Sequence, residues 1–296
     1  MASTAVRASR VHAVALAWTA AYGGVRVWFA TGHAPAWKLP GRDLLVPDWI
    51  AVAACLVSAA ALIALNQRPR SKFLIRALWV LAAGWVVAAA FALLDVVAAV
   101  FPGLGIPFDP AGMLSRFTAL AGAVLLGATA LARQRRLDLT CLRCTGQPRL
   151  SATPTWALAA AWLAVVGCLT RLVAQTAVGA GTLYPSGASQ FAFEGGFLLA
   201  GVVLPLLLIY RQLLPRWVLL LPGATLGAGI TAYFGVGLLQ MIGNAVQGKP
   251  AYGDPVLPDA FFWVAVPAYL VWGVGLLVAS YAFHLRTRRL CPGCGR

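Results

Sequence analysis

Charged side chains are scarce in this chain of 296 residues, and acidic ones are the scarcest. Charged residues make up 10% of the sequence, and 8 acidic residues stand against 23 basic ones. A soluble domain carries roughly 25% charged residues, so the composition excludes an ordinary water-soluble protein. The net charge of +15 does not indicate a nucleic-acid partner, because the basic residues lie in short connections between apolar runs, as in membrane proteins. We expect a bilayer as the partner, with anionic headgroups on its cytoplasmic side.

Familiar catalytic motifs are also lacking. The sequence has no glycine-rich nucleotide-binding loop and no Ser/His/Asp arrangement, and its 3 histidines show no metal-ligand spacing with carboxylates. Polar residues inside the apolar runs are therefore the main candidates for function.

The apolar runs themselves predict the fold. Hydrophobic residues make up 61% of the chain, and the mean hydropathy is +0.82. Runs of about 20 residues fit helices that cross a hydrocarbon core of about 30 Å, and they lack the alternation of barrel strands. We predict an all-α integral membrane protein with eight transmembrane helices, at residues 11–31, 48–65, 77–101, 113–132, 154–177, 191–210, 217–242 and 260–284.

The distribution of Lys and Arg predicts the orientation of these spans. Most basic residues lie before residue 11, near residues 68–76, 133–149 and 211–216, and after residue 285. These segments should be cytoplasmic, which places both termini inside the cell. The first run follows Arg7 and Arg10 and could alternatively be a cleaved signal peptide. We expect it to be retained, because it continues past Arg26 and has a counterpart in the middle of the chain.

That counterpart is part of an internal repeat. Polar residues recur in the same order in the two halves: Arg26 matches Arg171, Asp48 matches Glu194, and Asp95 matches Gln240. We predict two tandem four-helix repeats, residues 1–150 and 151–296. Chance similarity between two Ala-, Leu- and Val-rich stretches is the alternative. Copies with an even number of spans lie parallel in the membrane, and ligand sites of such repeats often lie at their interface.

The matched polar residues are the candidate site, because a charge at bilayer depth costs at least about 2.5 kcal/mol. We expect Arg26 to pair with Asp95 or Asp48, and Arg171 with Glu194, around a polar cavity in the outer leaflet. The predicted catalytic acids are Asp95 and Glu194, and the predicted substrate-binding residues are Arg26, Arg171, Asp48 and Gln240. In the alternative interpretation, the arginines extend to the headgroups and Glu194 only stabilises a helix start.

Each half ends in a pair of cysteines on the predicted cytoplasmic side. Cys141 and Cys144, like Cys291 and Cys294, have the Cys-x-x-Cys spacing of zinc knuckles, and two knuckles supply four thiolates for one tetrahedral Zn²⁺. A structural zinc clamp between the halves is the leading prediction. A redox-active dithiol and free thiols are the alternatives.

Residues 18–32, with the sequence WTAAYGGVRVWFATG, resemble the first helix of small multi-pass membrane proteins of actinobacteria. Those proteins have four or eight spans and mostly no assigned function, so the resemblance implies a bacterial plasma-membrane location and no catalytic residues. Three function classes stay open. They are a membrane-embedded enzyme acting on a lipid-like, isoprenoid or small anionic substrate, a small-molecule transporter with its site between the repeats, and a structural or accessory subunit.

Overall fold

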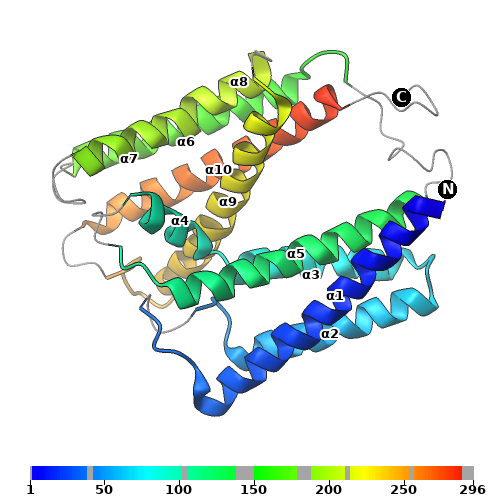
Figure 1. The fold of residues 1–296 in the computed structure, drawn as a ribbon. Helices are drawn as coiled ribbons and strands as arrows, with labels where there is room; N and C mark the ends of the chain where they lie inside the picture. Colours follow the sequence, from blue (N-terminus) through cyan, green and yellow to red (C-terminus); the bar gives the residue numbers. More distant parts are fainter. Residues whose placement is uncertain are drawn as a thin grey trace. The chain divides into compact units, whose positions relative to one another are not determined.

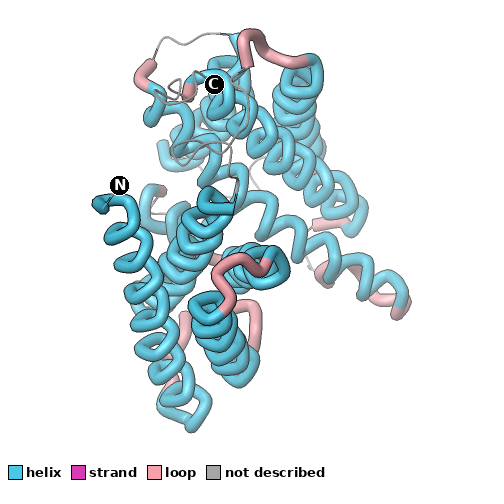
Figure 2. Tube along the Cα trace, turned by 90° about the vertical axis from the view of Figure 1, so that its right-hand side faces the viewer, coloured by secondary structure: helices cyan, strands magenta, loops and turns pink. Residues whose placement is uncertain are grey.

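The computed structural model describes residues 2–38, 43–101, 106–137, 150–178, 188–210, 214–253 and 257–288. Every regular element in these segments is a helix (Figure 2). The prediction of an all-α protein is therefore confirmed for the described part of the chain.

Six helical segments among the described residues are long and apolar enough to cross a membrane. They are α2 (Asp48–Gln67), Pro110–Arg135 within α5 (Pro110–Leu137), α6 (Thr155–Ala177), Phe191–Tyr210, α9 (Arg216–Val246) and α10 (Asp259–Thr287). A seventh is present if α3 (Lys72–Ala88) and α4 (Ala92–Val100) form one broken span. α1 (Ala2–Trp28) is not among them, so the eighth span stays a prediction.

The span predicted at residues 77–101 is divided into two helices. α3 ends at Ala88, whose carbonyl oxygen accepts a hydrogen bond from the backbone N–H of Leu45, at 3.0 Å. The next bonds are turn-like, from Ala90 to Val87 and from Ala92 to Ala89. The carbonyl oxygen of Ala88 therefore bonds to the N–H of a loop residue instead of to an N–H in the next turn of α3. The helix ends there, and the chain continues as α4.

The chain divides into two compact units (Figure 1). Unit 1 comprises residues 1–92, 108–147 and 291–296, and unit 2 comprises residues 93–107 and 148–290. The division near residue 147 lies close to the boundary predicted for the repeats. Residues 93–107, which include most of α4, nevertheless belong with the second half.

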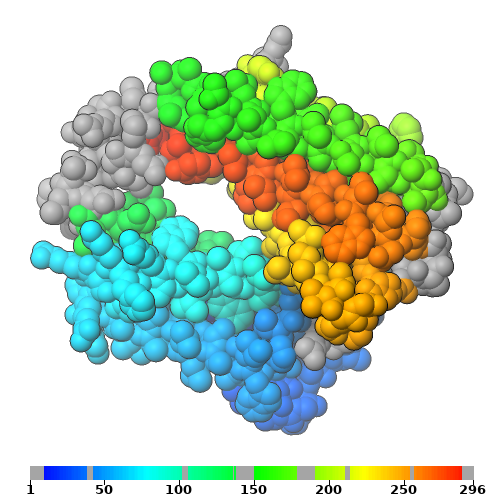
Figure 3. Space-filling view, turned by 180° about the vertical axis from the view of Figure 1, so that it is seen from behind, coloured from blue at the N-terminus to red at the C-terminus, as the bar shows by residue number. Residues whose placement is uncertain are grey.

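The same pattern of helix-to-helix contacts is found in each unit. In unit 1, α1 and α3 each pack against both α2 and α5. In unit 2, α6 and α9 each pack against both α8 (Leu204–Tyr210) and α10. Figure 3 shows α10, in orange, lying along α6, in green. Glycine allows this close approach, since a Cβ at Gly167 would lie 2.5 Å from the Ala268 carbonyl oxygen.

Two short irregular helical segments lie near the candidate site residues. η1 (Phe29–His33) begins three residues after Arg26 and is kinked at Gly32, whose φ of 96° is not helical. η3 (Leu199–Val203) joins α7 (Ala188–Leu198) to α8. Pro205 follows η3 and has no backbone N–H for an ordinary helical bond, which explains a wide turn here. Such turns are frequent at functional sites.

Candidate functional site

Unit 1 contains a buried ion cluster around Arg26. The Arg26 guanidinium is 0% exposed and donates to Asp43 Oδ2 at 2.6 Å and to Asp48 Oδ1 at 2.9 Å. It also donates to the hydroxyl oxygens of Tyr22 and Ser115, which come from α1 and α5. Of the two partners predicted for Arg26, the structure therefore shows Asp48.

Asp43 is the centre of this cluster and lies in the connection between α1 and α2. Its carboxylate accepts from Arg26 and Ser115, and its backbone carbonyl accepts from Nε of the fully buried Arg116 at 2.6 Å. Burial opposes ionisation of the Asp43 carboxyl, but the hydrogen bonds and charge of Arg26 outweigh it and hold the pKa of Asp43 below its usual value. The cluster binds α1, α2 and α5 to one loop, which is a structural role.

Unit 2 also contains a buried arginine, Arg171 of α6. Its side chain is 3% exposed, and its Nη1 donates to Glu194 Oε2 at 2.8 Å. Its Nε donates to the Tyr269 hydroxyl at 2.6 Å, and its Cζ lies 4.4 Å from the centre of the Phe197 ring. The predicted pairing of Arg171 with Glu194 is found, and two aromatic residues complete its surroundings.

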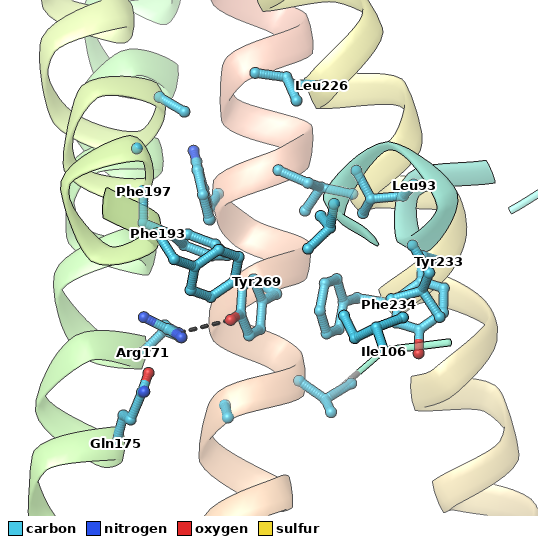
Figure 4. A pocket seen from close by; sticks show the side chains of 18 of the residues that line it. Leu93, Ile106, Arg171, Gln175, Phe193, Phe197, Leu226, Tyr233, Phe234 and Tyr269 are labelled. Carbon is cyan, nitrogen blue, oxygen red and sulfur yellow. Dashed lines mark hydrogen bonds between the residues drawn. The ribbon is translucent and has the colours of Figure 1, made fainter. Parts of the chain in front are cut away.

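Arg171 lies in the wall of a large pocket within unit 2 (Figure 4). The pocket has a volume of about 670 Å³, and its lining is mostly apolar and aromatic. The lining includes Leu93, Val97 and Phe101 from α4 and the residue after it, Arg171 and Gln175 from α6, Phe193, Phe197 and Ala200 from α7 and η3, Tyr233 and Phe234 from α9, and Ala265, Tyr269 and Trp272 from α10. Such a pocket, apolar with a few convergent polar groups, is typical of a small-molecule site.

Gln175 is the pocket residue whose polar atoms are least satisfied by the protein. It lies one helical turn after Arg171 and is 1% exposed. Among the described residues, neither Oε1 nor Nε2 of its amide has a hydrogen-bond partner. The indole N–H of Trp272, also in the lining, is likewise buried without an acceptor from this part of the chain. A buried amide without partners is costly, so Gln175 is a candidate for contact with a ligand.

Two predicted site residues do not join these groups. Gln240 is exposed on α9 and does not line the pocket. Asp95 is 1% exposed in α4, and it is not part of the pocket lining although its neighbours Leu94 and Val96 are. Within the two units, Arg171 lines the pocket of unit 2, and Arg26 and Asp48 belong to the ion cluster of unit 1. The prediction of one cavity shared by all the candidates stays a prediction.

Sequence reasoning missed Asp43, Tyr22, Ser115, Gln175 and Tyr269. Two of them carried a usable signal, because Tyr22 lies four residues before Arg26 and Gln175 lies four residues after Arg171. Residues four apart share a helix face. The others come from loops or distant helices, which the sequence does not place beside an arginine.

The metal prediction falls on residues outside the described part of the chain. Cys141, Cys144, Cys291 and Cys294 all lie there, so the zinc clamp stays a prediction. Among the described residues, no group of three or more His, Cys, Asp or Glu side chains is arranged to hold a metal ion. Comparisons with protein-family models, curated proteins and solved structures find no match.

Proposed function

We propose that this chain is a multi-pass membrane protein that binds an amphiphilic, lipid-like molecule in the pocket of unit 2. The observation that supports this most is the pocket itself, which has a volume of about 670 Å³ and combines aromatic and aliphatic walls with Arg171 and Gln175. The apolar wall suits a hydrocarbon chain, since burying apolar surface contributes about 25 cal/mol per Å². The few polar groups would orient its head.

The proposal concerns binding, which a membrane enzyme and a transporter both require. Binding of a particular lipid would distinguish an enzyme or a transporter from a purely structural subunit, because the pocket of a structural subunit would hold no particular lipid. Catalysis by Asp95 or Glu194 is a further hypothesis. Neither side chain lines the pocket. Glu194 contacts the lining residue Arg171 directly, which makes it the first of the two to test.

The eight-span topology with cytoplasmic termini is also part of the proposal. α1 has low hydropathy partly because it contains Arg26, and hydropathy scales count that residue as a full charge. In the fold, Asp43 and Asp48 neutralise this charge within the same unit. This lowers the cost of placing α1 in a bilayer and supports its assignment as the first span. A cysteine introduced at Ser3 in a background without other cysteines should react with an impermeant maleimide only in permeabilised cells.

Paired contacts between helices support the proposed duplication. In unit 1, Gly23 of α1 faces Cys55 of α2, and a Cβ at Gly23 would lie 3.3 Å from the Cys55 Cβ. In unit 2 the two residue types are exchanged, because Cys168 of α6 faces Gly201 of η3, with 2.2 Å from a Cβ at Gly201 to the Cys168 sulfur. Cys168 precedes Arg171 by three residues, as Gly23 precedes Arg26. A compensated exchange of this kind is expected of two copies that kept the same packing.

Lipid binding is tested by filling the pocket. Ala200 of η3 lines it, whereas the neighbouring Leu199 is 62% exposed and does not. Full-length protein would be purified with each residue changed to Trp, and bound lipids would be measured by native mass spectrometry. A photoreactive long-chain alcohol would be crosslinked in parallel and mapped by peptide sequencing.

We expect the parent and Leu199→Trp to retain bound lipid and to crosslink within residues 93–101 and 193–200. Ala200→Trp should lose both signals while its melting temperature stays close to that of Leu199→Trp. Equal labelling of all three proteins, or labelling confined to other helices, would show that the pocket is not the binding site.

A further inference from the structure

The polar end of the pocket is already nearly neutral. Arg171 supplies a positive charge and Glu194 a negative one, with their atoms 2.8 Å apart. The second contact of the guanidinium is with the Tyr269 hydroxyl, and its face lies against the Phe197 ring. An anionic head that approached Arg171 would also approach the Glu194 carboxylate, and in an apolar environment that repulsion is weakly screened.

The unsatisfied groups at this end demand both kinds of hydrogen bond. The Gln175 amide offers two N–H donors and one carbonyl acceptor, and all of them lack partners in a side chain that is 1% exposed. This requirement is the same whichever way the amide is turned. The Trp272 indole lies elsewhere in the lining, because its Cε2 is beside Gly201 and Cys168, two helical turns before Gln175. Gln175 is therefore the residue that distinguishes one head group from another.

We infer that the pocket selects an uncharged head that both donates and accepts hydrogen bonds, as the hydroxyl of a long-chain alcohol does. The inference rests on the lipid binding proposed above and names its ligand class. A hydroxyl can donate to Gln175 Oε1 and accept from Gln175 Nε2. An ionised carboxylate or phosphate can only accept and leaves Oε1 buried without a donor. An ammonium can only donate, and an alkane does neither.

This selection reverses the role expected for the buried arginine. Guanidinium suits bidentate recognition of carboxylate and phosphate, but here the protein supplies the carboxylate itself. Arg171, which Glu194 holds in place, then becomes a fixed polar part of the wall beside the head group. Gln175, one turn away on the same helix, becomes the residue that determines specificity.

The test uses full-length protein in phosphatidylcholine nanodiscs and one photoreactive C16 alcohol as the reporter. Five unlabelled C16 compounds compete with this reporter for crosslinking at equal concentrations: hexadecanol, hexadecanoate, hexadecyl phosphate, hexadecylamine and hexadecane. The variant is Gln175→Leu, which keeps the size of the side chain and removes both polar functions. Gln240→Leu is the matched control, because Gln240 lies on α9 in the same unit and is exposed outside the pocket.

Hexadecanol should compete at a concentration about tenfold lower than hexadecane, because one buried hydrogen-bonding group satisfied on binding is worth about one order of magnitude. Gln175→Leu should remove this difference, and Gln240→Leu should keep it. Stronger competition by the phosphate or carboxylate, or a preference for alcohol that survives Gln175→Leu, would overturn the inference. Crosslinking that all chains displace equally would refute the head-group selection alone, whereas the absence of pocket crosslinking would refute the proposed function as well.

Discussion

Arg26 of unit 1 and Arg171 of unit 2 are both buried, and their side chains are satisfied in different ways. Arg26 contacts two carboxylates and two hydroxyl groups from its own unit. Arg171 contacts one carboxylate, one tyrosine hydroxyl and the face of an aromatic ring, and it lines a pocket. One arginine binds helices together, and the other lies where a ligand can reach. The same residue type at matched sequence positions therefore has different surroundings in the two units.

The sequence shows how this difference arises in the proposed duplication. Tyr22, four residues before Arg26, contacts the guanidinium, and the residue four before Arg171 is Gly167. Asp43 stands five residues before Asp48, and Ser189 stands five residues before Glu194. The second half therefore has neither the aromatic hydroxyl nor the carboxylate of the first half at these positions.

Replacement of each buried arginine should cause the largest losses of stability, and the two losses should differ. Arg26→Met leaves Asp43, which is 3% exposed, as a buried charge without its main partner, and such losses cost about 3–5 kcal/mol. Arg171→Met should cost less than half of that, because the Glu194 side chain is 21% exposed and can be hydrated. Thermal unfolding of the purified proteins measures both. Arg10→Met, at an exposed position, is the control, and equal losses for Arg26→Met and Arg171→Met would contradict the distinction.

The exchanged Gly and Cys pairs give a second, smaller contrast. Gly201→Ala should destabilise unit 2 by about 1–3 kcal/mol, since the new methyl group would overlap the Cys168 side chain. Cys168→Gly in the same chain should restore most of the loss. Gly23→Ala should cost less, because its nearest contact is the longer one, to Cys55. The melting temperatures of the three variants test this expectation. If Cys168→Gly does not restore the stability that Gly201→Ala removes, residues 168 and 201 do not pack directly against each other.

Acid should affect unit 1 through Asp43. The pKa of Asp43 in the folded protein lies below its reference value of 3.8, because the hydrogen bonds and charge of Arg26 outweigh its burial. The unfolded chain therefore binds the proton first, so this contribution is fully present above about pH 4 and is lost as the pH falls through the lower, folded-state pKa. Asp43→Asn should flatten the decline of the melting temperature below pH 4. An unchanged acid slope would show that another group is responsible.

The smallest expected effect is at Gln175 without added ligand. Gln175→Leu removes a buried amide that has no partner among the described residues, so stability should be unchanged or raised by up to about 1 kcal/mol. Gln240→Leu should leave stability unchanged. A clear loss of stability on Gln175→Leu alone, measured in lipid-free detergent, would show that the amide is needed by the fold itself.

The sequence predicted what depends on helix periodicity and not what depends on loops. The Arg171–Glu194 pair was predictable, because both residues lie at corresponding depths in adjacent apolar runs. Asp43 was not, since a loop carboxylate gives no sign that it will fold back onto a buried guanidinium. The end of α3 at Ala88 was not predictable either. It depends on a bond from Leu45, and the run of residues 88–92 contains neither Gly nor Pro to indicate a break.

The break after α3 also affects how unit 2 is assembled during synthesis. α4 supplies one wall of the pocket but is translated before α6 to α10, which supply the others. When translation has reached residue 147, α4 has been made, but the helices that form the rest of the pocket have not. A fragment expressed from residue 148 would contain those helices without α4. Ligand binding should therefore be absent from either fragment alone and return when the two are produced together.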